Sequence, residues 1–172
     1  MQGENERIVL RPPKVEDGTA IWRLVRDSGV LDLNSTYCYL LMCKHFADTC
    51  AVAEFNGEIV GFVTAYLPPD QQDTLFIWQI GIDASMRGRG LATRLLLELL
   101  KRDVCRDIQF VDATVGPSNQ ASRALFHSLA KRLNTDLSEH PYFEATLFPS
   151  TDHEPENLLH IGPFSLSQQN LK

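Results

Sequence analysis

The chain has 172 residues, 44% of them hydrophobic and 22% charged, which predicts one folded domain over residues 1–172 with a core at about 8–164. Its formal net charge at pH 7 is −6, and this acidic balance disfavours a nucleic-acid partner, because nucleic-acid binders cluster Lys and Arg to displace the counterions of the phosphates. No run is apolar enough to span a bilayer, so we expect no membrane partner.

The chain begins with a polar segment, residues 1–7, that lacks the apolar stretch of a secretory signal peptide. We therefore expect a cytoplasmic protein whose cysteines are reduced. The cysteines are Cys38, Cys43, Cys50 and Cys105. They contain no CxxC pair, so we expect no metal site, and burial as small hydrophobic side chains is the expected role of most of them.

Hydrophobic periodicity and turn residues divide the chain into strands and helices. In chain order we expect a strand at 8–10, helices at 15–27 and 39–46, strands at 49–55, 58–67 and 74–82, a helix at 91–102, a strand at 108–115, a helix at 121–130, and strands around 143–148 and 158–164. Gly29 is placed to end the first helix, and Ser35 or Thr36 to cap the second. The dipeptide Asn56-Gly57 indicates a β-hairpin. This order predicts an α/β fold of the α+β kind, with a mixed central sheet flanked by helices.

A glycine-rich segment joins the strand at 74–82 to the helix at 91–102, and it reads Arg87-Gly88-Arg89-Gly90-Leu91-Ala92. Glycine lets the backbone approach a ligand closely, and the free amides at a helix start attract anions. The segment is neither a Walker loop nor a GxGxxG turn of a βαβ unit. It suits a diphosphate, although a helix-start turn with solvated arginines would have the same composition.

The segment resembles the cofactor loop of the GNAT acetyltransferase superfamily, [Gln/Arg]-x-x-Gly-x-[Gly/Ala], with Arg87, Gly90 and Ala92 at the defining positions. The resemblance implies the acyl-CoA N-acyltransferase fold with a splayed strand pair, and acetyl-CoA as co-substrate. It also implies that the amides of 87–92 hold the pyrophosphate, while the backbone of 78–82 pairs with the pantetheine arm. The residues assigned to acetyl-CoA in this way are Ile80, Ile82, Arg87, Gly88, Arg89, Gly90, Leu91, Ala92, Asn119 and Phe126.

A second stretch departs from the superfamily pattern of an Asn followed by Ala-x-x-Leu-Tyr. Asn119 and Leu125 fit this pattern, but Phe126 stands where many relatives have Tyr. In those relatives the tyrosine is the usual candidate to protonate the departing thiolate, and phenylalanine has no proton to donate. Either another group protonates the thiolate, or it leaves unassisted, which the modest pKa of a thiol allows.

Four further stretches are similar to the family of L-2,4-diaminobutyrate acetyltransferases, and they lie at 31–39, 76–82, 116–119 and 153–156. The resemblance runs over about 9–164, and the block Asp-x-Asn-Ser-x-Tyr-x-Tyr is more specific than the GNAT loop. It implies acetyl transfer to the side-chain (N4) amine of L-2,4-diaminobutyrate, a step of ectoine biosynthesis, by a homodimer.

A diamino acid presents two ammonium groups and one carboxylate, so a pocket for it needs carboxylates together with hydroxyls or amides. The catalytic candidates are Asp32 and Glu156, which can hold a cation, and Trp78, which can wall the pocket or lie against the ammonium. The candidates for further substrate contacts are Asn34, Thr36, Tyr37, Tyr39 and His153. Each also has a structural explanation, as a turn former, a half-buried aromatic residue or part of a solvated tail.

The expected reaction is direct attack of the neutral amine on the carbonyl of acetyl-CoA. The ammonium, with a pKa of about 10, must first lose a proton to a carboxylate, a histidine or a water chain. Backbone N–H groups of the splayed strand could stabilise the oxyanion, and a covalent cysteine route is less attractive because no Cys has a sequence-evident His partner. Two alternatives stay open: a GNAT enzyme for another small amine, such as a polyamine or an aminoglycoside, and a non-catalytic acyl-CoA-binding module.

Overall fold

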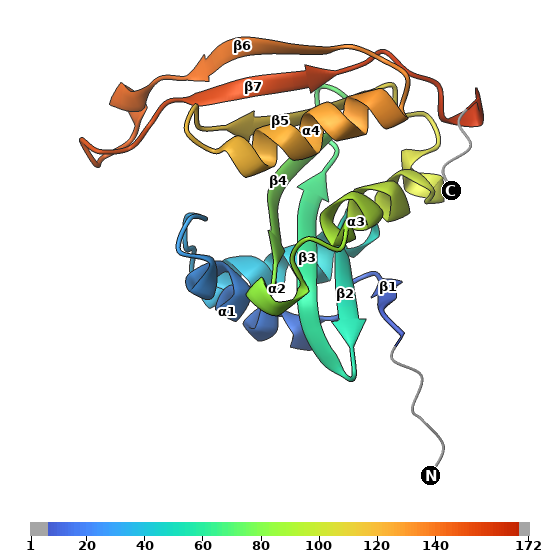
Figure 1. Cartoon of the computed structure of the whole chain (residues 1–172), viewed down its shortest axis with the longest axis vertical. Helices are drawn as coiled ribbons and strands as arrows, with labels where there is room; N and C mark the ends of the chain where they lie inside the picture. The colour runs from blue at the N-terminus through green and yellow to red at the C-terminus, as the bar shows by residue number, and fades with distance from the viewer. Residues whose placement is uncertain (1–6, 169–172) are drawn as a thin grey trace.

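The computed structural model describes residues 7–168, and its strands form one seven-stranded sheet in the order β1-β2-β3-β4-β5-β7-β6 (Figure 1). β4 and β5 are parallel, and the other described pairs are antiparallel. The predicted α/β class, mixed sheet and element order are confirmed. The elements are β1 (Val9–Arg11), α1 (Gly18–Ser28), α2 (Thr36–His45), β2 (Ala51–Phe55), β3 (Glu58–Tyr66), β4 (Thr74–Ile82), α3 (Leu91–Leu100), β5 (Phe110–Val115), α4 (Gln120–Arg132), β6 (Leu137–Phe143) and β7 (Glu156–Ile161).

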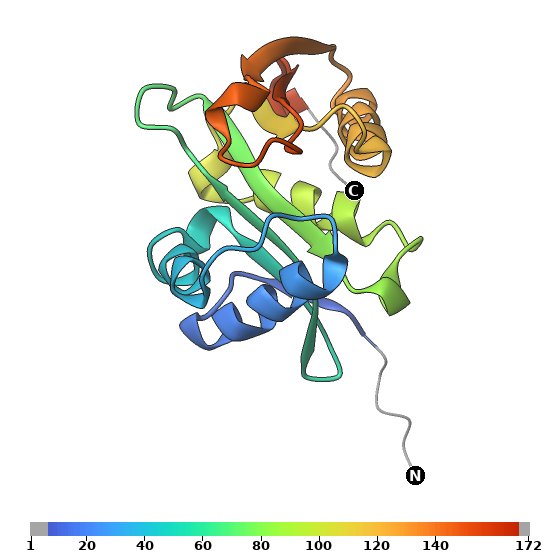
Figure 2. The ribbon, with the colours of Figure 1, turned by 90° about the vertical axis from the view of Figure 1, so that its left-hand side faces the viewer.

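Helices cover both faces of the sheet, with α1 and α2 on one side and α3 and α4 on the other (Figure 2). The smaller core, under α1 and α2, contains Ile21, Tyr39 and Phe62. The larger core, under α3 and α4, contains Leu95 and Leu129 among many aliphatic residues. Because β2 and β3 are covered on both faces, their sequences are nearly continuous apolar runs, and removal of this surface from water is the main term stabilising the fold.

β4 and β5 separate along their length, as the resemblance implied. Their pairing runs from Thr74 opposite Phe110 to Ile77 opposite Ala113. β4 continues to Ile82, still paired with β3, whereas β5 turns away to pair with β7. In Figure 1, β5, β6 and β7 lie crosswise above β2, β3 and β4. Among the described strands, none therefore pairs with the edge of 78–82 that faces β5.

A β-bulge in β4 lies at the point where the two strands separate. Thr64 of β3 pairs with Gln79 and Ala65 with Ile77, so Trp78 is the extra residue between them. The Thr64 hydroxyl donates to the carbonyl of Gln79 (3.3 Å) and accepts from its N–H (3.2 Å), which closes the ladder beside the bulge. A bulge turns a side chain out of the regular alternation, and here it re-aims the Trp78 indole.

The turns and helix ends follow the sequence signals. Gly29 ends α1 with a φ of 67°, and Asn56 and Gly57 form the β2–β3 turn with φ values of 51° and 79°. Ser35 caps α2, since its hydroxyl accepts from the N–H of Cys38 at 3.3 Å. α2 begins at Thr36, earlier than the predicted residue 39, because this cap fixes the first turn.

The strand predicted around 143–148 is wrong. The strand lies at Leu137–Phe143, and Ala145–Leu147 form a 3-10 turn. β6 is the outermost strand of the sheet and almost all its side chains are exposed, so it shows no apolar alternation. It also contains Pro141, which an edge strand tolerates because its N–H position can face away from the ladder. The strand was predicted at 143–148 because that run is more apolar than β6. The following strand, β7, begins at Glu156 rather than at residue 158.

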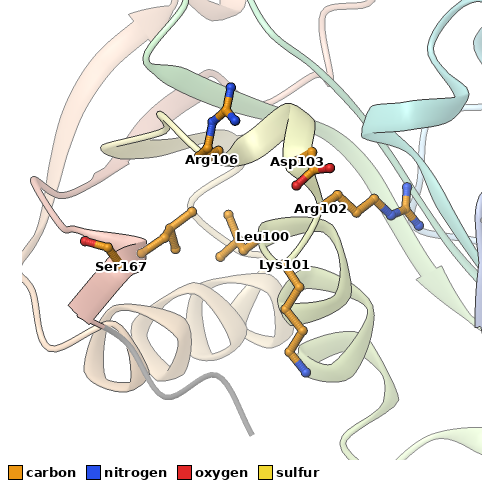
Figure 3. A pocket seen from close by; sticks show the side chains of 7 residues that line it. Leu100, Lys101, Arg102, Asp103, Arg106 and Ser167 are labelled. Atoms are coloured by element: carbon orange, nitrogen blue, oxygen red, sulfur yellow. The ribbon is translucent and has the colours of Figure 1, made fainter.

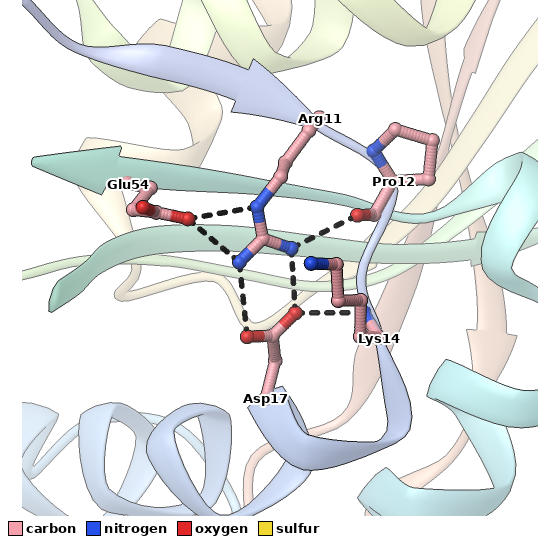
Figure 4. Close-up of polar contacts among 5 residues, drawn as sticks. All are labelled: Arg11, Pro12, Lys14, Asp17 and Glu54. Atoms are coloured by element: carbon pink, nitrogen blue, oxygen red, sulfur yellow. Dashed lines mark hydrogen bonds and ion pairs between the residues drawn. The ribbon is translucent and has the colours of Figure 1, made fainter. Parts of the chain in front are cut away.

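A charged cluster fastens β1 to β2 and to the turn before α1 (Figure 4). The guanidinium of Arg11 donates to Asp17 at 2.7 and 3.1 Å and to Glu54 at 2.8 Å, and Asp17 also accepts from the N–H of Lys14. Burial opposes ionisation of Asp17, but the hydrogen bonds from Arg11 and Lys14 outweigh it and lower the pKa of the carboxyl. The cluster fixes β1 against β2 and against the turn that begins α1.

Within residues 7–168, no helix combines the length and apolarity needed to cross a bilayer. The polar N-terminal segment considered above lies, through residue 6, outside the described residues.

Candidate functional site

An anion cradle lies at the start of α3. Gly88 and Gly90 have φ values of 75° and 69°, and a Cβ added at either would meet nothing within 4 Å, so the backbone here is left-handed and faces open space. No side chain caps α3 at Gly90. The first N–H groups of a helix have no intrahelical acceptor, so they remain available to an anion. Arg87 and Arg89 are exposed beside them.

The cradle is joined to the free edge of β4. The Nε of Arg87 donates to the carbonyl of Ile82 at 3.3 Å, which fixes the loop to the end of the strand. Leu91 is buried against the core and Ala92 is half-buried, so the loop rests on the first turn of α3. Left-handed glycines, free amides and arginines together fit a pyrophosphate, and the adjoining edge of 78–82 fits an extended chain that hydrogen-bonds to a strand.

At the position where many relatives have a tyrosine, α4 carries Phe126, which has no proton to donate. Asn119 caps this helix, since its Oδ1 accepts from the N–H of Ser122 at 3.1 Å. Phe126 is 2% exposed and belongs to the larger core. The side-chain oxygen of Asn119 is thus used by the helix, and the ring of Phe126 fills apolar space.

The structure brings together two residues that lie 121 positions apart in the chain, Asp32 and His153. Asp32 is in the loop between α1 and α2, His153 is in the turn between β6 and β7, and Oδ2 of Asp32 lies 3.1 Å from Nε2 of His153. In Figure 2 these two segments face each other at one end of the sheet. The segment before β7 therefore folds back over the α1–α2 loop.

The imidazole of His153 is held in one orientation. The ring of Phe148 stacks on it at 3.7 Å with an interplanar angle of 9°, and Nδ1 donates to the carbonyl of Glu154 at 2.6 Å. The hydrogen bond to Asp32 raises the pKa of His153, and the Glu154 carbonyl and the charges of Asp32 and Glu156 raise it further. Because Nδ1 already bears a hydrogen and a carboxylate can only accept, the contact at Nε2 describes an imidazolium.

Glu156, the first residue of β7, lies close enough to share this electrostatic environment. Burial raises the pKa of its carboxyl, the hydrogen bond from Thr114 and the charge of His153 lower it, and the charges of Asp32 and Glu154 raise it again. The net shift is upward. A half-buried carboxyl of raised pKa takes up a proton more readily than a solvated one.

The aromatic candidates divide between the interior and the surface. Tyr39 is 0% exposed, and its ring stacks on Trp78 with centroids 5.9 Å apart. Its hydroxyl donates to Oε1 of Gln79 at 2.9 Å and accepts from the N–H of Asn34 at 3.4 Å. Trp78 is half-buried, whereas Tyr37 is 68% exposed at the start of α2, beside half-buried Thr36. Tyr39 therefore supports the site from below, and Trp78 is the ring nearer its surface.

Sequence reasoning missed Glu154, whose side chain fastens the β6–β7 turn to the loop before α4. Oε2 of Glu154 accepts from the hydroxyl of Ser118 at 2.8 Å and from its N–H at 3.2 Å. It lies over Gly116, where a Cβ would be 2.6 Å away, so this approach requires a glycine. The stretches 116–119 and 153–156 were both singled out, but no local pattern shows that they touch.

Replacing Glu154 with Ala should raise KM for the amine substrate severalfold, because the turn that carries His153 loses its tie to the α4 side. The melting temperature should hardly change, since Glu154 is exposed and a single exposed polar contact is worth about 0.2–1 kcal/mol. Steady-state kinetics and thermal melting measure the two effects. Ser118→Ala is the matched control: it removes the hydroxyl and keeps the N–H, so it should have the smaller effect. Equal kinetics for Glu154→Ala and wild type would contradict this role.

The remaining candidate features lie elsewhere. A hollow of about 450 Å³ at the far end of α3 is shown in Figure 3, and there Arg102 extends away from the hollow to donate to the Cys50 carbonyl at 2.6 Å. A second, of about 420 Å³, adjoins the hydrogen-bonded pair of Asp112 and His160. Neither is lined by the cradle, Asp32 or His153.

The thiols are placed as expected, because Cys43, Cys50 and Cys105 are buried and unbridged. Burial raises the pKa of Cys43 and Cys105 to about 11 and that of Cys50 to about 12, so they stay protonated and are poor nucleophiles. Across residues 7–168, no three His, Cys, Asp or Glu side chains are grouped to hold a metal.

A sheet that opens between β4 and β5, with an anion cradle at the start of the next helix, defines the class of acyl-CoA-dependent N-acyltransferases. Residues 19–130 match the model of the acetyltransferase (GNAT) family. The chain is 52% identical to the L-2,4-diaminobutyric acid acetyltransferase of Marinococcus halophilus, over 95% of this chain and 94% of that protein. It is 53% identical to the enzyme of the same name from Halalkalibacterium halodurans, over 91% and 82%. The chain belongs to the GNAT family and, within it, to the L-2,4-diaminobutyric acid acetyltransferases.

Solved structures agree with this placement. The diaminobutyrate acetyltransferase from Paenibacillus lautus, in complex with L-2,4-diaminobutyric acid and coenzyme A, matches with a TM-score of 0.90 and 43% identity, over 93% of this chain and 97% of that one. Ard1 from Thermoplasma volcanium, at 15% identity and a TM-score of 0.70 over 92% and 98%, shares the fold alone.

Proposed function

We propose that this protein transfers the acetyl group of acetyl-CoA to the N4 amine of L-2,4-diaminobutyrate, giving N4-acetyl-L-2,4-diaminobutyrate for ectoine biosynthesis. The observation that carries the proposal is the meeting of Asp32 and His153 beside β4, where the Asp32 carbonyl accepts from Gln79: a cation-binding carboxylate and a histidine lie along the strand whose end carries the cradle. The similarity to the diaminobutyric acid acetyltransferases supports the choice of substrate.

The cofactor side is built mainly from backbone. Acetyl-CoA, when bound, supplies a thioester whose carbonyl carbon a neutral amine can attack. The amides from Arg87 through Gly88, Arg89, Gly90 and Leu91 to Ala92 would hold its pyrophosphate, with the two arginine side chains nearby. The backbone at Ile80 and Ile82 would align the pantetheine arm along β4. Asn119 and Phe126 would contribute indirectly, by capping α4 and by filling the core beneath it.

On the amine side, Asp32 and Glu156 would bind the cationic end of the diamino acid, and Trp78 would lie against it. Asn34, Thr36 and Tyr37 would supply further polar contacts. Tyr39, with its hydroxyl already used inside the protein, would act by supporting Trp78.

Proton transfer is assigned to the pair of Asp32 and His153. An arriving ammonium would compete with the imidazolium for Asp32, which would lower the pKa of His153 and release its proton to solvent. Nε2 would then be free to take the proton that the N4 amine must lose, while Nδ1 stays fixed on the Glu154 carbonyl. At the other end no tyrosine protonates the thiolate, and a thiol pKa of about 8.5 lets it leave unassisted.

We also propose that the chain is one domain, acts in the cytoplasm without nucleic-acid or membrane partners, and forms a homodimer. Exposed Tyr142 and Phe143 on β6, at 49% and 44% exposure, would suit a subunit contact. Sedimentation of the wild type and of a Tyr142→Ser, Phe143→Ser variant tests the dimer.

Release of coenzyme A thiol on adding an amine tests the function. With acetyl-CoA saturating, kcat/KM is compared for L-2,4-diaminobutyrate, a polyamine and an aminoglycoside, against hydrolysis without amine. Fastest release with diaminobutyrate is expected, and mass spectrometry should find the acetyl group on N4. Faster turnover of a polyamine would reject the substrate, and no release with any amine would favour a binding module.

A further inference from the structure

We propose that Gln79 is a positioning residue of this reaction: its buried side-chain amide holds the main chain at Asp32 so that the carboxylate reaches both the amine and His153. The inference rests on the proposed function, which gives Asp32 its role. Gln79 itself is not among the groups expected to touch either substrate.

The side chain of Gln79 bridges the sheet and the α1–α2 loop. Its Nε2 donates to the carbonyl of Asp32 at 2.8 Å, and its Oε1 accepts from the hydroxyl of Tyr39 at 2.9 Å. The residue is 6% exposed and Tyr39 is 0% exposed. A buried amide with its oxygen and one N–H both engaged has a single orientation, because turning it over would place its oxygen against the Asp32 carbonyl, acceptor against acceptor.

The backbone of Gln79 is equally fixed. It pairs with Thr64 directly beside the Trp78 bulge, and the Thr64 hydroxyl bonds both its N–H and its carbonyl. Thr64 is 1% exposed, so water does not compete for these bonds. The Gln79 bond therefore fixes the main chain of Asp32 relative to the bulge in β4 that orients Trp78. One residue of β4 thus positions two of the proposed substrate-binding side chains.

The loop at Asp32 depends on this bond because its other main-chain ties are local, and the contact with His153 involves only the Asp32 side chain. At its start, the Ser28 hydroxyl accepts from the N–H of Leu31 at 3.1 Å, and within it Nδ2 of Asn34 donates to the Asp32 carbonyl at 3.3 Å. The side chain of Asp32 is 75% exposed and so receives little support from packing. Among residues 7–168, the Gln79 bond is the one that joins the Asp32 main chain to the sheet.

A purely structural role is the competing explanation, since loss of Gln79 leaves the buried Tyr39 hydroxyl without an acceptor and destabilises the protein. Two variants separate the roles. Gln79→Met removes both bonds, whereas Gln79→Met combined with Tyr39→Phe also removes the stranded hydroxyl and should recover melting temperature. Tyr39→Phe alone keeps the bond from Gln79 to Asp32 and is the matched control.

We expect both Gln79→Met proteins to lose about 10- to 100-fold in kcat/KM for L-2,4-diaminobutyrate, with KM for acetyl-CoA within about twofold of wild type, because small misplacements of a binding group cost this much. Tyr39→Phe, which loses the hydroxyl but keeps the bond from Gln79 to Asp32, should lose less activity than either Gln79→Met protein. The acid limb of the pH profile should move to lower pH in both Gln79→Met proteins. The charged groups that face His153 are Asp32 and Glu156, while Glu154 contacts it through its main-chain carbonyl, and only Asp32 is released by the substitution.

A double variant that melts like wild type and uses diaminobutyrate like wild type would overturn the proposal. Failure of both Gln79→Met proteins to fold would also overturn it, since Gln79 would then serve the core. Failure of the proposed function is distinguishable from either: wild type itself would show no turnover of diaminobutyrate, or Asp32→Asn would leave that turnover unchanged.

Discussion

Replacing Asp32 with Asn should lower kcat/KM for L-2,4-diaminobutyrate about 100-fold and leave KM for acetyl-CoA nearly unchanged. Asn has almost the same shape and keeps the main-chain bonds at this position, but it has no charge to attract an ammonium. A hydrogen bond to a charged group contributes about 1.5–3 kcal/mol, which corresponds to a factor of about 10–100. Steady-state kinetics with each substrate varied in turn measures the effect.

The same substitution should change the pH dependence. In wild type the hydrogen bond with Asp32 raises the pKa of His153. Because the reaction needs the neutral imidazole, the acid limb of the activity profile lies at a higher pH than an ordinary histidine would give. Without the carboxylate the pKa of His153 falls, and the acid limb of kcat/KM should move to lower pH.

Asp27→Asn is the matched control for Asp32→Asn. It removes one carboxylate from the end of α1, close in sequence, where the carboxylate pairs with Arg26 rather than with His153. Its change in net charge is the same, so general attraction of a cationic substrate is affected equally. If both variants lose the same activity, the acidity of the whole surface rather than Asp32 binds the amine. If Asp32→Asn unfolds, the residue shapes a turn.

Features that depend on near neighbours in the chain were predictable. The cradle follows from the residues between Trp78 and Arg102, the hairpin from Asn56-Gly57 and the end of α1 from Gly29, because each is fixed by backbone chemistry within a few positions. The splay of β4 from β5 was implied by family resemblance and has no local signal at all.

The pairing of Asp32 with His153 was not predictable in the same way. Asp32 and His153 were named separately, but their contact joins segments 121 residues apart, and it forms through a turn whose outer strand was placed wrongly. Gln79 and Glu154 carried no signal of their role, because a glutamine on a strand and a glutamate on a polar tail are ordinary residues. Their partners become visible once the chain is folded.

Gly90→Val should raise KM for acetyl-CoA by a factor of about 10 or more while leaving the recognition of diaminobutyrate intact. Gly90 is left-handed at φ 69°, a conformation that costs other L-residues about 1–2 kcal/mol, so part of the effect is backbone strain. The larger part is positional. Open space lies over Gly90, so the valine side chain fits the protein itself but occupies the room in which a pyrophosphate would approach the amides.

Gly57→Val separates these two contributions. Gly57 has a φ of 79°, it also faces open space, and it lies in the β2–β3 turn away from the cradle. Both variants should therefore lose similar melting temperature, because both force a β-branched residue into the left-handed region. Only Gly90→Val should weaken the binding of acetyl-CoA. Titration calorimetry with coenzyme A measures this binding separately from turnover. Equal affinities of the two variants for coenzyme A would contradict a role of the cradle in binding. A selective loss in Gly90→Val would show that the backbone at the start of α3 binds the cofactor.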